Sequence, residues 1–173
     1  DYAASINIIS PTADPVAAPV TLTVTGDNLT PTLPNIDLSG SENGIVPLPD
    51  DVDPLFSAVA SRYTHIVAPN EDLIQILIQD DFTTEQILHA RRVLESYLVD
   101  IPGSDWGSSK SLIANAIATT NAILFLLNDE SEYENQNLWT LIDSGVQGQD
   151  LLATEVHPEG SPAYMNSSER DAT

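Results

Sequence analysis

Hydrophobic and polar positions follow a strand-like pattern in two neighbouring stretches near the middle of the chain. Residues 63–67 (YTHIV) and 73–78 (LIQILI) are rich in β-branched and apolar residues, and a turn-forming segment, 68–72 (APNED), separates them. Two such runs on either side of a short polar connection are typical of antiparallel strands. The pattern therefore predicts a β-hairpin over residues 63–78.

The strongest local signal marks the start of a helix at residues 82–87 (FTTEQI). Thr83 and Gln86 stand at the spacing of a capping box, in which each side chain bonds the backbone of the other residue. Phe82 and Ile87 occupy the positions of a hydrophobic staple around it. A helix is expected to run to about residue 99, because a Pro-Gly pair follows at 102–103.

Further elements are expected along the rest of the chain. A short helix starts at Asp53-Pro54. A second long helix covers 108–119, in which Leu112, Ile113, Ala116 and Ile117 form one broad apolar side and the small Ala114 and Ala118 allow close packing. The other expected elements are a buried strand at 122–127, an acidic loop at 128–135, an apolar element of unclear type at 138–142, and a strand at 151–156. Together these elements predict an α+β fold, a small mixed sheet with two or three helices packed on one face.

The first fifty residues have a different pattern. They hold seven of the twelve prolines and no basic residue. Proline fixes the backbone and removes an N–H donor, which disfavours helices and central strands. One alternating run, 20–25 (VTLTVT), predicts a strand. We therefore expect an extended proline-rich arm over residues 1–50 and the α+β domain over 51–173; the alternative for the arm is a disordered linker.

Charge narrows the set of partners. Five Lys and Arg stand against 26 Asp and Glu, a net charge of -21. Such a surface repels phosphate backbones and anionic membranes, so nucleic-acid binding is not expected. It favours solubility at high salt, cation binding or docking to a basic partner. The 42% of hydrophobic residues is enough for a real core.

Several features favour an extracellular protein. The sequons at Asn28 and Asn166 are candidate glycosylation sites. The longest wholly apolar run, 122–127, is too short to span a bilayer, so no membrane insertion is expected. A start at Asp1 is typical of a processed N-terminus. We therefore expect a secreted glycoprotein.

No catalytic set can be assembled from the sequence. The three histidines, His65, His89 and His157, lack zinc-site spacing, and their expected roles are structural. No G-x-S-x-G motif and no phosphate-binding glycine loop occur. Two weaker candidates remain. Asp129, Glu132 and Glu134 are calcium candidates in a loop that lacks the usual glycine, and Trp106 and Trp139 are candidates for the lining of an apolar pocket.

Three segments carry a resemblance: TTEQILHARRVLESYLVDIPGS, KSLIANAIATTNAILFLLND and the terminal SERDAT. Over residues 63–173 the chain resembles a poorly characterised group of secreted zincin-like proteins of marine organisms, a metallopeptidase-type group. The resemblance implies that the segment at 170–172 (RDA) leads into a helix with a histidine pair that would hold zinc. That helix would lie beyond Thr173, so no metal or catalytic residue is assigned in this chain.

Two functions from different classes follow. The first is a secreted acidic binding or structural subunit of an extracellular assembly, non-catalytic on its own, that holds an apolar ligand or pigment. The alternative is the N-terminal portion of a processed zincin-like metallopeptidase. In either case a companion chain or a continuation would attach without a disulfide, because no cysteine is present. A calcium- or mineral-interacting matrix protein is a third hypothesis.

Overall fold

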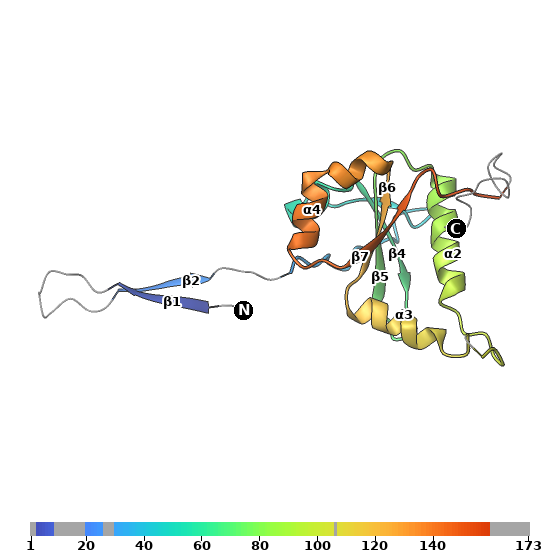
Figure 1. Cartoon of the computed structure of the whole chain (residues 1–173), viewed down its shortest axis with the longest axis horizontal. Helices are drawn as coiled ribbons and strands as arrows, with labels where there is room; N and C mark the ends of the chain where they lie inside the picture. Colours follow the sequence, from blue (N-terminus) through green and yellow to red (C-terminus); the bar gives the residue numbers. More distant parts are fainter. Residues whose placement is uncertain (1–2, 9–19, 26–29, 106, 160–173) are drawn as a thin grey trace, which may run out of the picture. The chain divides into compact units, whose positions relative to one another are not determined.

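The computed structural model describes residues 3–8, 20–25, 30–105 and 107–159 of the 173-residue chain. The chain divides into two compact units, Asp1–Thr30 and Pro31–Thr173. In the first unit, β1 (Ala3–Ile8) pairs antiparallel with β2 (Val20–Thr25), at the position where a strand is predicted. The second unit holds all the other helices and strands (Figure 1).

A five-stranded mixed sheet forms the centre of the second unit, in the order β3-β4-β5-β6-β7. The first two pairs, β3-β4 and β4-β5, are antiparallel, and the pairs β5-β6 and β6-β7 are parallel. This arrangement confirms the predicted α+β class with a mixed sheet. The elements are β3 (Val46–Pro47), α1 (Pro54–Ser57), β4 (Arg62–Val67), β5 (Leu73–Ile78), α2 (Thr84–Tyr97), α3 (Lys110–Thr119), β6 (Ile123–Leu127), the 3₁₀ helix η1 (Glu130–Glu134), α4 (Gln136–Asp143) and β7 (Gly148–Leu152).

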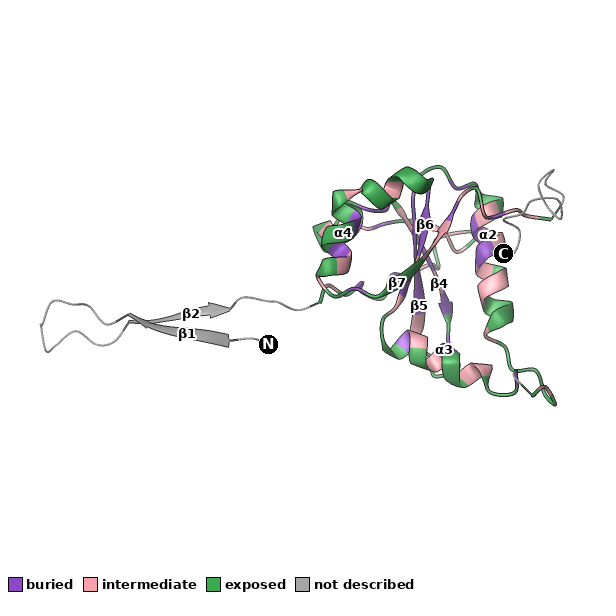
Figure 2. Ribbon diagram, in the orientation of Figure 1, coloured by how far each residue is buried: buried purple, intermediate pink, exposed green. Residues whose placement is uncertain are grey.

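Successive residues of the central strand β5 point to opposite faces of the sheet, as strand geometry requires. Ile74, Ile76 and Ile78 pack with buried residues of α2 and α3, so we call this side the α2/α3 face. Leu77 packs on the other side with Phe56 of α1 and with residues of α4, which defines the α1/α4 face. Figure 1 shows α2 and α4 on opposite sides of the strands, and Figure 2 shows that the residues facing the sheet are buried.

The helices therefore cover both faces, and the prediction that they pack on one face is wrong. The chain crosses from β5 to β6 through α2 and α3, and then from β6 to β7 through α4. Both crossovers step in the same direction across the sheet, but their helices lie on opposite faces. The two crossovers consequently have opposite hands, whereas parallel crossovers are right-handed in nearly all proteins.

Local signals place α2 and the hairpin as predicted. Thr83 Oγ1 accepts a hydrogen bond from the Gln86 backbone N–H at 3.2 Å, and Gln86 Oε1 accepts one from the Thr83 N–H at 3.0 Å. The capping box is therefore present, and the helix runs to Tyr97. Phe82 and Ile87, predicted as a staple, are both buried. The β4-β5 hairpin turns through Glu71, whose φ is 70°.

Other boundaries and faces differ from the predictions. Leu33, Ile36 and Leu48 are buried in the core, so the second unit begins near residue 31 rather than residue 51. The apolar element of unclear type is helix α4, and the last strand spans Gly148–Leu152 instead of 151–156. In α3 the small Ala114 and Ala118 are buried, as expected for close packing, whereas Leu112, Ile113 and Ala116 of the broad apolar side are exposed.

Candidate functional site

An apolar cavity of about 410 Å³ lies between the sheet and the helices α2 and α3. Strands β4 and β5 contribute Ile66, Val67 and Ile74 to its wall, and Ala68 and Pro69 follow β4 in the turn. The remaining lining residues come from the end of α2, the segment after it and α3: Glu95, Leu98, Val99, Asp100, Ser111 and Ala114. We call this hollow the apolar cavity.

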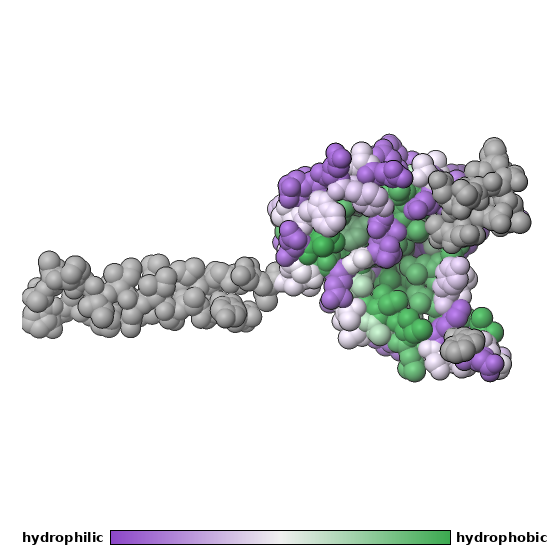
Figure 3. All heavy atoms as spheres, in the orientation of Figure 1, coloured by the Kyte–Doolittle hydropathy of each residue, from purple (hydrophilic) through white to green (hydrophobic). Residues whose placement is uncertain are grey.

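Large apolar side chains stay exposed around the apolar cavity. Val67 and Val99, which line it, are 62% and 61% exposed. Tyr97, Ile101, Leu112 and Ile113, on α2, the segment after it and α3, are also more than half exposed. Figure 3 shows hydrophobic residues gathered near α3 on the visible face. Large exposed apolar patches are typical of interaction surfaces and ligand-binding grooves.

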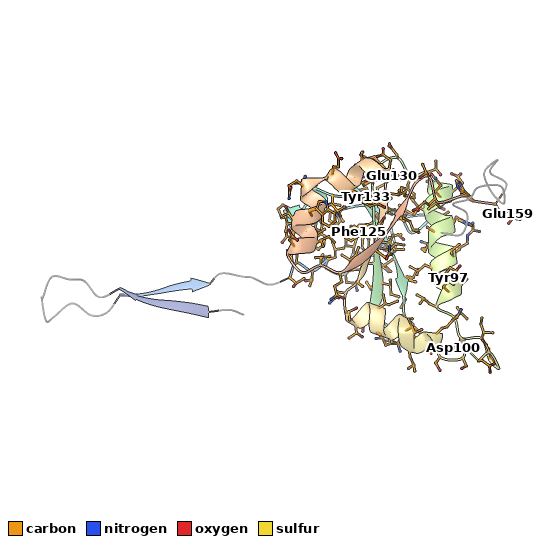
Figure 4. All side chains as sticks on the ribbon, in the orientation of Figure 1. Tyr97, Asp100, Phe125, Glu130, Tyr133 and Glu159 are labelled. Carbon is orange, nitrogen blue, oxygen red and sulfur yellow. The ribbon has the colours of Figure 1, made fainter. Side chains whose placement is uncertain are left out.

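Polar groups at the edge of the apolar cavity are held in place. Asp100 Oδ1 accepts a hydrogen bond from the Ser111 backbone N–H at 2.7 Å, and Oδ2 accepts one from Ser111 Oγ at 2.8 Å. The hydrogen bond from the Ser111 backbone, and to a smaller extent the one from its side chain, lowers the pKa of Asp100 below its ordinary value. The pair ties the start of α3 to the end of α2, where Figure 4 shows Tyr97 and Asp100. The geometry of this end of the cavity is therefore fixed by the chain itself.

A second hollow, of about 230 Å³, lies beside β7 and α4, and we call it the Trp139 hollow. Trp139, a predicted pocket residue, is 46% exposed and donates a hydrogen bond from Nε1 to the Tyr133 carbonyl oxygen at 2.6 Å. Tyr133 in turn donates from its hydroxyl to Asp150 Oδ2 at 2.7 Å. This bond to Asp150, with smaller effects of burial and nearby acids, raises the pKa of Tyr133 to about 12. Figure 4 shows Tyr133 and Phe125 in this region.

Gly148 allows β7 to pack closely against β6 beside the Trp139 hollow. A Cβ at this position would lie 2.4 Å from Phe125 Cε2 and 2.7 Å from the Ile123 carbonyl oxygen. Only glycine fits so close to the neighbouring strand without a shift of the backbone. Trp139 and Gly148 therefore belong to one site, whereas Trp106, the other predicted pocket residue, lies outside the described residues.

The three calcium candidates are engaged in other contacts or held apart. Asp129 Oδ1 accepts from the Ser131 N–H at 2.7 Å and caps η1, and hydrogen bonds from the Ser131 side chain and then from its backbone lower the pKa of Asp129. Glu132 Oε2 accepts from Gln79 Nε2 and from Asn135 Nδ2, each at 2.8 Å. Across the described ranges, no group of three or more His, Asp or Glu side chains is placed to hold a metal ion. This holds for Asp129, Glu132 and Glu134 as well.

The histidines occupy two regions. His65 lies in β4 with its ring 5.7 Å from that of Tyr63, and burial is the main cause of its lowered pKa. His89 of α2 also has a lowered pKa, first because of burial and then because of Arg92, with smaller opposed effects of Glu159 and His157. The structure thus brings His89 and the segment 157–159 together. No local pattern predicts this proximity, because 68 positions separate His89 from His157.

The exposed residues around the apolar cavity were not predicted as a site. The sequence feature that points to them is the broad apolar surface of α3. Its sequence, KSLIANAIAT, carries more large apolar residues than one packed side needs. The glycosylation candidates Asn28 and Asn166 lie outside the described residues.

Within the described ranges, no helix has both the length and the apolar character needed to cross a bilayer. Neither a protein-family model, nor a curated protein, nor a solved structure matches the chain.

Proposed function

We propose that the protein is a secreted, acidic binding subunit of an extracellular assembly, non-catalytic on its own, which holds an apolar small molecule between its sheet and its helices. The observation that carries the proposal is the apolar cavity over β4 and β5. Its volume of about 410 Å³ falls in the usual range for small-molecule sites, about 300–1,000 Å³. Its walls are mostly aliphatic, and polar groups occur only at one end.

Exposure of Val67 and Val99 supports a ligand as the missing cover. Each side chain keeps more than half of its surface in water although it borders a hollow. Covering apolar surface stabilises a complex by about 25 cal/mol per Å² before the entropic costs of binding. A ligand that fills the cavity therefore gains most of its affinity from these walls.

The groups at the edge indicate the polarity of the ligand. Glu95 and Asp100 are the ionisable residues that line the apolar cavity. Asp100 already accepts two hydrogen bonds from Ser111, so it is a fixed negative charge rather than a proton donor. An uncharged apolar molecule, such as a pigment or another lipophilic compound, fits this edge better than a fatty acid, whose carboxylate would be repelled.

Composition supports the extracellular role. The net charge of -21 suits a protein that stays soluble in a saline medium, and the sequons at Asn28 and Asn166 fit secretion. An acidic surface also fits a basic companion chain, which would bind non-covalently because no cysteine is present.

The test uses the neutral probe N-phenyl-1-naphthylamine, whose fluorescence rises in apolar sites. We expect saturable binding to the full chain and a several-fold weaker affinity for the double variant Val67→Thr, Val99→Thr, which keeps both side-chain shapes but makes both polar. The matched control is Leu112→Thr, because Leu112 is 67% exposed but does not line the cavity. Equal loss in both variants would indicate general surface adhesion, and absence of saturable binding would refute the proposal.

A further inference from the structure

Strand β7 forms an outer edge of the sheet, and half of its backbone groups point away from β6. The Ala153 N–H donates to the Leu127 carbonyl at 2.9 Å, and the Ile123 N–H donates to the Gln147 carbonyl at 2.9 Å. In a parallel strand, alternate residues turn both backbone groups toward the same neighbour. Residues 147, 149, 151 and 153 therefore face β6, and residues 148, 150 and 152 face outward.

The outward groups are not equally available. Glu155 Oε2 accepts a hydrogen bond from the Leu152 N–H at 2.8 Å and so closes one end of the edge. Among the residues that the structure describes, no strand pairs with this side of β7. The Asp150 carbonyl has one long contact, 3.5 Å from Gln149 Nε2. The open part of the edge is therefore short and centred on Gly148 and Asp150.

The Trp139 hollow lies directly beside this open edge. Gly148 and Asp150 pair with Ile123 and Phe125 of β6, and their side-chain positions lie on the α1/α4 face, where the hollow is. Gly148 and Asp150 line the hollow together with Trp139 of α4, which is 46% exposed. A strand added next to β7 would place every second side chain on this face. One of these side chains would enter the Trp139 hollow.

Charge around the hollow has one sign. Asp150, Glu155 and Glu130 all act on the Tyr133 hydroxyl and raise its pKa. No basic residue is among those that line the hollow in the described part of the chain. The same acids oppose pairing of this edge with a second copy of a chain whose net charge is -21, and charged residues on sheet edges commonly prevent self-association. They attract a positively charged strand.

We propose that the open edge of β7 binds an extended basic peptide segment of a partner protein as an added strand, with one large apolar side chain of that segment in the Trp139 hollow. Backbone hydrogen bonds at Gly148 and Asp150 give such a complex its orientation. The hollow selects the apolar residue, and the surrounding acids select lysine or arginine at the other positions. This division between backbone affinity and pocket specificity is the general pattern of strand addition.

The probe is a fluorescein-labelled peptide of sequence KTKFKTK, measured by fluorescence anisotropy against the full chain at low salt. Asp150→Pro removes the outward N–H without touching the bonds to β6, because proline is tolerated where the N–H points to solvent. Asp150→Ala is its matched control, since both variants lose the carboxylate and only the proline loses the N–H. We expect Asp150→Pro to bind about fivefold to tenfold more weakly than Asp150→Ala, the loss of about one hydrogen bond.

Two further measurements complete the test. Trp139→Ala and the peptide KTKAKTK should each weaken binding, and the acidic peptide ETEFETE should not bind. Circular dichroism and thermal midpoints must show that the variants remain folded. Equal affinity of Asp150→Pro and Asp150→Ala, equal binding of the acidic peptide, or no binding of KTKFKTK would overturn the proposal. Concentration-dependent dimerisation that Asp150→Pro abolishes would also overturn it, because the occupant would then be a second copy.

Discussion

The two faces of the sheet are stabilised by different kinds of interaction. On the α2/α3 face the buried side chains are almost wholly aliphatic, such as Ile76, Ile87 and Leu126. On the α1/α4 face the buried set includes the aromatic rings of Phe56 and Phe125, and the amide of Gln79 is buried beside them. The α2/α3 face also buries one polar side chain, Thr64, whose Oγ1 donates to the Gly44 carbonyl oxygen at 2.6 Å, whereas the α1/α4 face buries a side-chain amide with several hydrogen bonds.

This difference indicates what each face can do. Aliphatic packing is non-directional, so the α2/α3 face can leave the apolar cavity unfilled without leaving a polar group unpaired. The α1/α4 face is fixed by Gln79, which donates from Nε2 to the Val59 carbonyl at 3.1 Å and to Glu132 at 2.8 Å. Gln79 Oε1 also accepts from the Asn128 N–H at 2.7 Å. This one side chain therefore joins the ends of β5 and β6 to the segment before β4.

The largest expected effect comes from removal of that junction. Gln79→Leu should destabilise the fold by about 3 kcal/mol, because partly buried donors and acceptors lose their partner. The comparison variant is Gln75→Leu, since Gln75 Nε2 makes long contacts, 3.3 Å to the Leu33 carbonyl and 3.5 Å to the Pro34 carbonyl, and the amide otherwise interacts with the Tyr63 hydroxyl. That variant should cost about 1 kcal/mol or less. Urea unfolding of both variants measures the gap.

Equal destabilisation by the two glutamine variants would contradict the role of Gln79 as the polar junction of the α1/α4 face. It would mean that the hydrogen bonds of Gln79 add nothing beyond burial of a side chain of that size. A larger loss of stability in Gln75→Leu than in Gln79→Leu would mean that the more important polar contact is that of Gln75 with the segment that contains Leu33.

A smaller effect is expected from the cap of α2 on the aliphatic face. Thr83→Ala should destabilise the protein by about 1 kcal/mol, because the Gln86 N–H loses its acceptor. Ser109 is the matched control, since it is the N-cap of α3 but makes no side-chain capping bond. Ser109→Ala should change stability by less than about 0.5 kcal/mol. Thermal unfolding of both variants tests this, and a cost at Ser109 as large as at Thr83 would refute it.

The sequence alone predicts the structural features that depend on residues close together in the chain. The Thr83 capping box and the β4-β5 hairpin depend on a few adjacent positions, and both are present as predicted. The α+β class follows from the mixture of strand and helix patterns, and it is confirmed as well. Trp139, a candidate for the lining of an apolar pocket, lines the Trp139 hollow, and its role in binding a ligand stays a prediction.

The rest depends on contacts between distant residues. The helices lie on both faces although β5, β6 and β7 follow one another in one direction across the sheet, which makes the two crossovers opposite in hand, and no local pattern encodes this. The sequence indicates close packing at Ala114, but it does not show that Leu112 and Ile113 stay exposed. Leu33 and Leu48 join the core although the proline-rich composition of their segment predicted an arm. The apolar cavity forms where β4, β5, α2 and α3 meet, and these elements are distant in the sequence.

The smallest effect concerns two tyrosines on the α1/α4 face whose pKa values are each raised to about 12 for different reasons. Burial raises the pKa of Tyr63, whereas the hydrogen bond to Asp150 is the main cause at Tyr133. Asp150→Asn should therefore lower the pKa of Tyr133 toward its ordinary value of 10.0 and leave that of Tyr63 raised. Ring-carbon NMR of the tyrosines resolves the two titrations, and a parallel change at Tyr63 would contradict this assignment of causes.

These raised values also set the pH dependence of stability. A tyrosine that holds its proton more tightly when folded contributes stability that is complete below its unfolded pKa of 10.0 and is lost as the pH rises toward about 12. At neutral pH both states carry the proton, so Asp150→Asn should not change stability there through this titration. Above pH 10 the contribution of Tyr133 should disappear in the variant, whereas that of Tyr63 should persist because its cause is burial. Unfolding midpoints at pH 7 and above pH 10 measure the difference, and an unchanged alkaline loss in Asp150→Asn would assign the whole effect to the buried ring.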